Sequence, residues 1–478
     1  MDAPVPALAT RAEAAARRLR EAEAVLLASH IDADGLTSAA IATTALERAD
    51  IPVATTFEKQ LDEEAIAAIA ASDYETVLFT DFGSGQLDVV VEYADRAGFT
   101  PIVADHHQPA DADAEFHVNP LLEGIDGGSE LSGAGAAYVL ARALADCGRD
   151  PEDHATDGNR DLAALAVVGA VGDMQTVDGE LVGANARIVE EGVAAGVLDT
   201  AKDLAMYGTQ TRPLPKLLEY ANDVRIPGIT NDQAGAVRFL DGLDLDLKAD
   251  GDWRTWADLT HDERQTVVSA LVRRAVRNGV PASRIDDLIG TSYTLPRETA
   301  GTVLRDASEF STLLNATARY DRADVGLAVC LGERGAAFGE AERLLRTHRR
   351  NLSQGIEWVA DHGVTREDNC QWFHAEDEIR ETIVGIIAGM AFGADGVDRS
   401  VPMIAFAHAE DGETKVSARG NARLLRKGLD LSAVMQQASR AVGGDGGGHA
   451  VAAGATVPRG KETAFVEAAD RILGEQLR

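Results

Sequence analysis

The sequence predicts an α/β protein with a parallel-sheet domain first, a helical connector next and a smaller α/β domain last. In roughly the first 200 residues, short apolar runs alternate with helical stretches, which is typical of a parallel sheet with crossover helices. A mostly helical interval follows, and the alternation returns near residue 335. The 478 residues are too many for one ordinary domain. We therefore expect domains at residues 1–199, 200–334 and 335–478.

The expected elements follow from local composition. Apolar and β-branched residues indicate strands, whereas Ala-rich stretches and stretches opened by acidic residues indicate helices. In the first domain, we expect strands at residues 25–28, 52–57, 76–80 and 101–104, and helices at 36–47 and 62–71. The connector should contain a charged helix at 262–277. In the last domain, we expect helices at 343–353 and 431–441 and strands at 401–407, 415–419 and 451–457, with a glycine-rich loop before the last strand.

The charge balance says more about habitat than about substrate. The chain has 78 acidic residues against 45 Lys and Arg, for a net charge of −33. Such a surface should repel nucleic acid at ordinary ionic strength. In molar salt, however, the Debye length falls to about 3 Å and the repulsion is screened. Arg outnumbers Lys and small apolar residues are common, so we attribute the charge to a halophilic cell.

The sequence does not indicate a membrane-spanning or secreted protein. No apolar stretch approaches the roughly 18 residues of a membrane span, and residues 1–20 lack the apolar core and cleavage site of a signal peptide. Cys147, Cys330 and Cys370 are scattered along the chain. This arrangement fits a reducing compartment and argues against a Cys-based zinc site. We expect a cytoplasmic protein.

Four polar motifs are expected at strand ends of the first domain. The first carries His30, Asp32 and Asp34, whose spacing of two points them to one side of an extended chain. The others are Asp81-Phe82-Gly83-Ser84-Gly85, Asp105-His106-His107 and Gly169-Ala170-Val171-Gly172-Asp173. Each motif alone is more often a turn or a cap than a site. The first three follow apolar strands, however, and a parallel sheet would bring them to one edge.

So many carboxylates at one edge would repel one another unless cations neutralise them. Mixed His and Asp ligands suit Mn²⁺, with Mg²⁺ or Zn²⁺ less favoured. Two such ions about 3.5–4 Å apart form the clamp used for in-line displacement at phosphorus. The motifs therefore predict a two-metal site that acts on phosphate esters.

In this order the motifs resemble those of the DHH phosphoesterase family, and within it the archaeal RecJ-like single-strand-specific exonucleases that associate with the GINS complex. The resemblance spans roughly the first 175 residues. It implies that Asp81 bridges the two metals and that five further residues complete the ligands: His30, Asp32, Asp34, His106 and Asp173. It also implies that His107 lies near the scissile phosphate, and that Asp105 orients a histidine or serves as an outer ligand.

A second set of residues in the last domain is suited to binding anions. Ser417 and Arg419 precede a glycine-rich stretch that contains Gly446, Gly447, Gly448 and His449. Glycines let backbone N–H groups approach a phosphate, and Arg419 can bind it through two hydrogen bonds. The plainer interpretation is a flexible hairpin loop. The pattern resembles the DHHA1 domain, which in this family holds the nucleotide or strand end.

Basic residues in the last domain are candidates for contacts with the strand's backbone. They are Arg346, Arg349, Arg350, Arg423, Arg426 and Lys427. A basic helix face is usually just solvated, but these clusters stand out in so acidic a chain. Residues 207–214 of the connector also resemble a stretch of archaeal RecJ-like proteins, and we expect them to pack between domains.

The resemblance implies a metal-dependent phosphodiesterase that releases mononucleotides from single-stranded DNA or RNA, in the 5′→3′ direction, with two Mn²⁺ ions or else Mg²⁺. Two alternatives stay open. One is a phosphodiesterase of very short RNAs, pAp or cyclic dinucleotides. The other is a replication-fork scaffold that binds GINS without catalysis. The long connector and the spacing of the first motif favour the longer strand as substrate.

Overall fold

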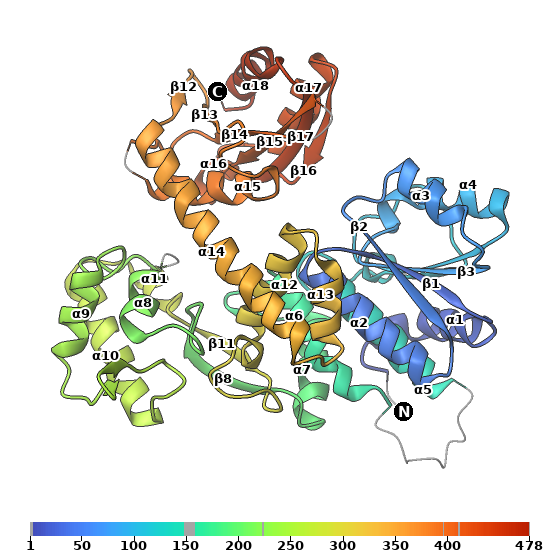
Figure 1. Ribbon diagram of the computed structural model, residues 1–478, viewed down its shortest axis with the longest axis horizontal. Helices are drawn as coiled ribbons and strands as arrows, with labels where there is room; N and C mark the ends of the chain where they lie inside the picture. The colour runs from blue at the N-terminus through green and yellow to red at the C-terminus, as the bar shows by residue number, and fades with distance from the viewer. Residues whose placement is uncertain (1–2, 148–157, 222–223, 395, 410–411, 478) are drawn as a thin grey trace. The chain divides into compact units, whose positions relative to one another are not determined.

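The computed structural model describes residues 3–147, 158–221, 224–394, 396–409 and 412–477. The chain forms two compact units, a first unit of Met1–Glu342 and a second unit of Arg343–Arg478 (Figure 1). The connector expected at 200–334 belongs to the first unit. Among the helices described, none is both long and apolar enough to cross a membrane.

The first unit is built on a five-stranded, wholly parallel sheet with the strand order β2-β1-β3-β4-β5. Its strands are β1 (Val25–His30), β2 (Val53–Glu58), β3 (Thr76–Thr80), β4 (Thr100–Ala104) and β5 (Phe116–Val118). After β2 the chain crosses back over β1 to form β3. The strand order therefore reverses between β1 and β3, and ligands of parallel sheets bind at such a switch point.

Helices cover both faces of this sheet (Figure 1). They are α1 (Ala9–Arg20), α2 (Ala33–Arg48), α3 (Glu63–Ala70), α4 (Leu87–Ala97) and α5 (Gly133–Asp146), and α6 (Ala163–Gly172) and α7 (Gly183–Ala194) pack against α5. Leu26 and Phe79 pack against Ile66 of α3 and Val90 of α4 in one apolar cluster. The opposite face is covered by α1, α2 and α5. The predicted parallel sheet and its crossover helices are confirmed.

One motif does not follow a strand as we expected. The stretch that ends in Asp173 is the C-terminal end of helix α6, and Asp173 is its C-cap residue. The interpretation as a strand was wrong because a short apolar run reads alike as a buried strand or a buried helix. Small residues let α6 pack closely: a Cβ at Gly172 would lie 2.9 Å from Ala33 Cβ.

The connector is helical but contains small sheets as well. Its helices are α8 (Leu214–Glu219), α9 (Gln233–Asp241), α10 (His261–Arg277), α11 (Ala282–Asp286), α12 (Ala307–Arg319) and α13 (Ala323–Cys330). Two antiparallel strand pairs accompany them: β8 (Asp199–Leu204) with β11 (Ile289–Thr294), and β9 (Lys248–Ala249) with β10 (Asp252–Trp253). A third pair, β6 (Thr176–Val177) with β7 (Glu180–Leu181), precedes the connector. Buried Trp256 belongs to a separate core of this region.

Within the connector, the stretch 207–214 is fixed to helix α12. The fully buried Glu309 accepts hydrogen bonds from the Gln210 N–H, at 2.7 Å, and from the Thr211 hydroxyl. Helix α12 also packs against α2 and α6. Its Asn315 Oδ1 accepts the Ala33 N–H at 3.0 Å, directly between Asp32 and Asp34. The stretch is therefore joined, through α12, to the helix that carries the first polar motif.

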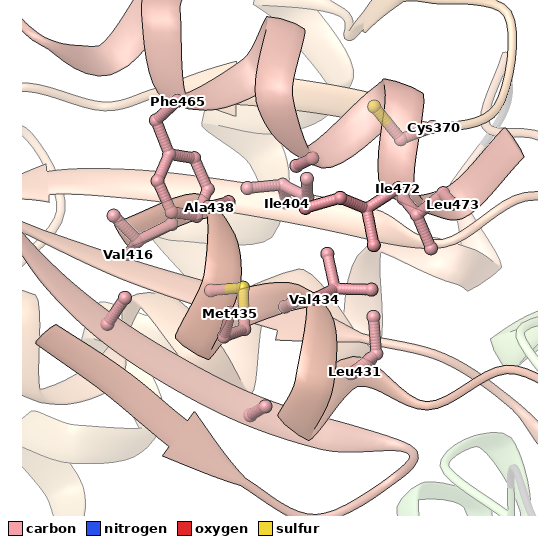
Figure 2. Packing of buried hydrophobic residues seen from close by; sticks show 14 of the residues in the cluster. Cys370, Ile404, Val416, Leu431, Val434, Met435, Ala438, Phe465, Ile472 and Leu473 are labelled. Atoms are coloured by element: carbon pink, nitrogen blue, oxygen red, sulfur yellow. The ribbon is translucent and has the colours of Figure 1, made fainter. Parts of the chain in front are cut away.

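The second unit contains a six-stranded sheet with the order β12-β13-β14-β15-β17-β16. The strands are β12 (Thr365–Arg366), β13 (Gln371–His374), β14 (Met403–His408), β15 (Glu413–Arg419), β16 (Asp445–Gly448) and β17 (Ala452–Pro458). The helices are α14 (Ala336–His362), which begins in the first unit, α15 (Glu381–Met390), α16 (Ala422–Leu425), α17 (Leu431–Ala441) and α18 (Glu462–Gln476). Figure 2 shows the core between the sheet and the last two helices, with Val416 opposite Phe465 and Met435.

The glycine-rich stretch is not a loop, contrary to our expectation. Residues Asp445–Gly448 form the edge strand β16, which pairs with β17. Glycine is unfavourable in strands because it loses more conformational entropy on folding than other residues and has no side chain to pack. Here it permits close approach, since a Cβ at Gly446 would lie 2.7 Å from Ala455 Cβ and 3.0 Å from the Met435 carbonyl oxygen.

Candidate metal centre

The first motif turns from strand into helix within three residues. His30 is the last residue of β1, and Asp32 is the N-cap of α2, where its Oδ1 accepts the Gly35 N–H at 3.0 Å. Asp34 lies in the first turn of α2. The expectation of an extended chain was therefore wrong, although the three side chains do converge. An aspartate at the N-cap satisfies a free N–H of the helix and so starts it at this point.

Asp81 follows β3 and lies between two groups of polar residues. Its φ of +61° is uncommon for a residue other than glycine. Its Oδ2 lies 3.6 Å from His30 Nδ1, and its Oδ1 lies 3.3 Å from His106 Nε2. Helix α5 begins directly against it, because a Cβ at Gly133 would lie 2.4 Å from Asp81 Oδ1. One carboxylate thus faces both groups, one oxygen toward each.

The first group consists of His30, Asp32 and Asp81, and the second of Asp34, His106 and Asp173. In the second group, His106 Nε2 lies 3.9 Å from Asp34 Oδ2 and 3.8 Å from Asp173 Oδ2. Asp34 also accepts the N–H groups of Gly133, at 2.7 Å, and Ala134, at 3.0 Å. The positive end of α5 therefore holds this buried carboxylate in place.

Asp105 has a different role from the other carboxylates. It is fully buried and accepts hydrogen bonds from the Ser84 N–H at 2.9 Å, the His106 N–H at 2.7 Å and His107 Nδ1 at 2.8 Å. Burial alone would raise the pKa of Asp105, but these partners hold it well below its usual range. Asp105 therefore stays ionised and orients His107, whose side chain is 53% exposed.

The pKa values of the centre record an excess of negative charge. Burial raises the pKa of Asp34, and the neighbouring Asp81 and Asp173 raise it further. Burial opposes the charged form of His30, yet Asp32 and Asp81 raise its pKa to about 11. Carboxylates this close either take up protons or bind a cation. The arrangement favours bound cations at neutral pH.

The residues present fit two divalent cations. Each group offers three ligand atoms within 4.8 Å of one another, and Asp81 belongs to one group while facing the other. A third group, Asp81, Asp105, His106 and His107, overlaps both. Carboxylate oxygens combined with imidazole nitrogens form a donor set for divalent metal ions. Of the predicted metal residues, all six lie in these groups.

Several buried polar residues of the centre escaped prediction. Gln175 Nε2 donates to Asp173 Oδ2 at 2.9 Å, and Asn185 Nδ2 donates to Gln175 Oε1 at 2.7 Å. On the other side, Asn119 Nδ2 donates to Ser84 Oγ and to the His107 carbonyl oxygen, both at 2.9 Å. Isolated Asn and Gln residues are usually exposed. The one available signal was that Gln175 follows Asp173 by two positions.

In the second unit, the sheet register brings three of the predicted phosphate-binding residues, Ser417, Arg419 and Gly447, to one face. Ser417 pairs with Gly454, which pairs with Gly447, so the three form one row across β15, β17 and β16. Arg419 pairs with Ala452 in the next row on the same face, and the His449 N–H donates to the Ala452 carbonyl at 2.9 Å. Gly446 and Gly448 alternate with Gly447 and therefore face the opposite side.

The face that carries Arg419 is open over the glycines. A Cβ at Gly447 would meet nothing within 4 Å, and one at Gly454 would meet only the Val416 carbonyl oxygen, at 3.5 Å. Helix α15 covers the adjacent strands β14 and β15, and Gly385 of α15 lies against the Arg419 guanidinium. Of the predicted basic residues, Arg346, Arg349 and Arg350 lie on α14, Arg423 on α16, and Arg426 and Lys427 just beyond α16.

Three family models match the chain. Residues 24–170 match the DHH family N-terminal domain, residues 206–289 match the DHH-CID domain and residues 370–475 match the DHHA1 domain. The parallel sheet and these matches together define a protein with the DHH phosphoesterase fold. The chain belongs to the DHH family, as a RecJ-like member with DHH, DHH-CID and DHHA1 domains.

Two relatives illustrate the extent of the similarity. An uncharacterized protein of Methanocaldococcus jannaschii is 29% identical over 458 residues, which cover 94% of this chain and 93% of the relative. The single-stranded-DNA-specific exonuclease RecJ of Dickeya dadantii is 31% identical over 180 residues. That match covers 34% of this chain and only 30% of the exonuclease.

Two solved structures share the fold. RecJ of Thermus thermophilus in complex with Mn²⁺ has a TM-score of 0.61 and 18% identity, over 99% of this chain and 55% of that one. CDC45 of Entamoeba histolytica has a TM-score of 0.67 and 12% identity, over 98% and 99% of the two chains. At such identities the likeness shows the fold alone.

Proposed function

We propose that this chain is a divalent-metal phosphodiesterase that removes mononucleotides from one end of single-stranded DNA or RNA. The observation that carries the proposal is the carboxylate of Asp81, whose two oxygens face two separate groups of His and Asp ligands. His30 and Asp32 would hold one ion, and Asp34, His106 and Asp173 the other, with Asp81 shared. When bound, two divalent ions supply the charge that activates water and polarises a phosphodiester.

His107 would act on the substrate's charge, and Asp105 would orient this histidine. Because His107 Nδ1 donates to the ionised Asp105, the imidazole keeps one orientation and presents Nε2 outward. Burial lowers the pKa of His107, but Asp105 raises it above its usual value. In the protonated form, Nε2 would donate a hydrogen bond to a phosphoryl oxygen as negative charge develops in the transition state. Asp105 would be a positioning residue, since its own oxygens accept N–H groups of Ser84, His106 and His107.

The second unit would bind the strand. Arg419 and Ser417 lie on the sheet face beside Gly447, where a Cβ would meet nothing within 4 Å, so a guanidinium and a hydroxyl flank the space that a phosphate would fill. Binding at this face would fix the strand end and would add affinity without taking part in bond cleavage. The 5′→3′ direction and the choice of Mn²⁺ over Mg²⁺ are part of the proposal by likeness to RecJ.

The likeness to CDC45 favours a second candidate, a replication-fork scaffold that binds a partner such as the GINS complex. The complete set of predicted ligands argues for catalysis, because a scaffold has no use for six converging His and Asp side chains. The two functions are compatible in one chain. A third candidate, hydrolysis of dinucleotides or pAp, uses the same centre and differs only in substrate length.

One experiment separates these candidates. The full chain would be incubated with Mn²⁺ and with single-stranded DNA or RNA of about 20 nucleotides, labelled at either end, or with a dinucleotide. The buffer would contain high salt, because salt screens the repulsion between the acidic surface and the substrate. Stepwise release of mononucleotides from one end of the longer strands is expected, and Asp81→Asn should abolish it. Cleavage of the dinucleotide alone would move the protein to the short-substrate class. Binding of GINS with no cleavage would leave the scaffold function.

A further inference from the structure

The two ligand groups differ in burial and in how their side chains are held. The side chains of Asp34 and His106 are 2% and 8% exposed, whereas those of His30 and Asp32 are 29% and 38% exposed. Asp173 is the exception in the buried group, at 34% exposed, and Asp81, which faces both groups, is 3% exposed. The more exposed group is held by the Gly35 N–H, which donates to Asp32 as part of the N-cap of α2.

Gln175 connects Asp173 to His106. Its Nε2 donates to Asp173 Oδ2 at 2.9 Å and to the Gly127 carbonyl oxygen at 2.8 Å. The same carbonyl lies 2.6 Å from His106 Nδ1. Because a carbonyl oxygen accepts only, His106 must carry a proton on Nδ1. Nε2, which faces Asp34, Asp81 and Asp173, is therefore the nitrogen that would coordinate an ion. One amide therefore holds one metal ligand and shares the carbonyl oxygen that orients another.

The orientation of this amide is determined by its partners. Both groups near Nε2, the Gly127 carbonyl and the Asp173 carboxylate, accept hydrogen bonds only. The group near Oε1 is Asn185 Nδ2, which donates at 2.7 Å. A flipped amide would lose all three hydrogen bonds. Gln175 is 1% exposed and Asn185 2% exposed, so water cannot replace these partners.

Gly127 has to be glycine for this arrangement. A Cβ at this position would lie 2.1 Å from the His106 carbonyl oxygen, which is backbone and cannot move aside. Only a residue without a side chain lets its carbonyl approach both His106 and Gln175. The link between the two ligands thus depends on three buried groups from separate parts of the chain: Gly127, Gln175 and Asn185.

We propose that Gln175 is a positioning residue that makes the Asp34–His106–Asp173 group the tighter of two unequal metal subsites. The proposal rests on the proposed two-ion function and goes beyond it by ranking the subsites and naming the residue responsible. Hydrogen-bonded partners of metal ligands typically change metal affinity by roughly 10- to 100-fold. The His30–Asp32 group, which is more exposed, would bind its ion more weakly.

The test is a Mn²⁺ titration of the metal-free full chain without substrate, followed by calorimetry and by electron paramagnetic resonance. The wild type should show two affinity classes. Gln175→Met keeps the volume and removes the amide, and we expect it to weaken the tighter class roughly 10- to 100-fold while leaving the weaker class unchanged. Asp32→Asn is the matched control and should weaken only the other class. Asn185→Ala should act in the same direction as Gln175→Met, with a smaller effect.

The outcomes separate a positioning role from a merely structural one. If Gln175→Met and Asn185→Ala weaken both classes equally, or neither class, the proposal is overturned. In cleavage assays, Gln175→Met should need more Mn²⁺ but reach the wild-type kcat at saturation. If wild type cleaves nothing while Gln175→Met still weakens the tighter class, the exonuclease function fails and the inference stands.

Discussion

The substitution Gly385→Ala tests whether Arg419 binds substrate in the position that the structure gives it. Gly385 is buried on α15, and a Cβ there would lie 2.5 Å from Arg419 Nη2 and 2.9 Å from Ser417 Oγ. Contacts this short require a shift. The Arg419 guanidinium is the end of a flexible side chain and can move away, so the fold should tolerate the change while the guanidinium leaves its place.

The expected loss follows from the bonds that Arg419 would make. A hydrogen bond between charged groups contributes about 1.5–3 kcal/mol, and each 1.4 kcal/mol is about tenfold in affinity. We therefore expect KM for a single strand to rise about 10- to 150-fold, with kcat unchanged at saturation. Helix propensity favours Ala over Gly by about 1 kcal/mol. This gain opposes the cost of displacing the Arg419 side chain, so the free energy of unfolding should change little.

Gly389→Ala is the matched control on the same helix. A Cβ at Gly389 would lie 3.9 Å from Arg419 Cγ and Cδ, which is ordinary van der Waals contact. It should gain the same helix propensity and leave KM unchanged. Steady-state cleavage of an end-labelled strand, with Arg419→Ala as the reference, measures both. Equal KM values for Gly385→Ala and wild type, beside a raised KM for Arg419→Ala, would refute the reasoning.

Three further predictions concern the first unit. Gly133→Ala should abolish Mn²⁺ binding and cost about 1–3 kcal/mol of stability, because its Cβ would lie 2.9 Å from Asp81 Cα. The control is Gly85→Ala, whose Cβ would have its nearest atom 3.8 Å away and which should have neither effect. Calorimetry measures both variants, and equal effects would contradict the prediction. His107→Ala should lower kcat about 10²- to 10⁴-fold without changing Mn²⁺ affinity, and a parallel loss of metal would show that the histidine is a ligand instead. Burial raises the pKa of Asp306 from 3.8 to about 6, so the folded protein holds this proton more tightly than the unfolded chain does. The stability that the protonated Asp306 contributes is complete below about pH 4 and is lost as pH rises through about 6, by at most about 3 kcal/mol. The difference in Tm between wild type and Asp306→Asn should follow that curve. A difference that does not depend on pH would contradict the prediction.

The sequence by itself determined which His and Asp residues lie together and the sheet that carries them. Strand β3 has its predicted bounds, because a β-branched apolar run that ends in an acidic motif is a local signal. The six predicted metal residues could be named because ligand type is a property of each residue, and parallel strands bring their ends together whatever their exact lengths.

Only the tertiary structure decided how those residues are held. It placed Asp34 in a helix and Asp173 at the end of another, since burial from neighbouring helices chooses between strand and helix for short apolar runs. It turned the glycine stretch into a strand by packing it against α17. It also buried Gln175, whose partners lie 48 residues away at Gly127 and 10 residues away at Asn185. Such hydrogen bonds leave no local pattern, because each donor and acceptor is common along any chain and only the fold brings them together.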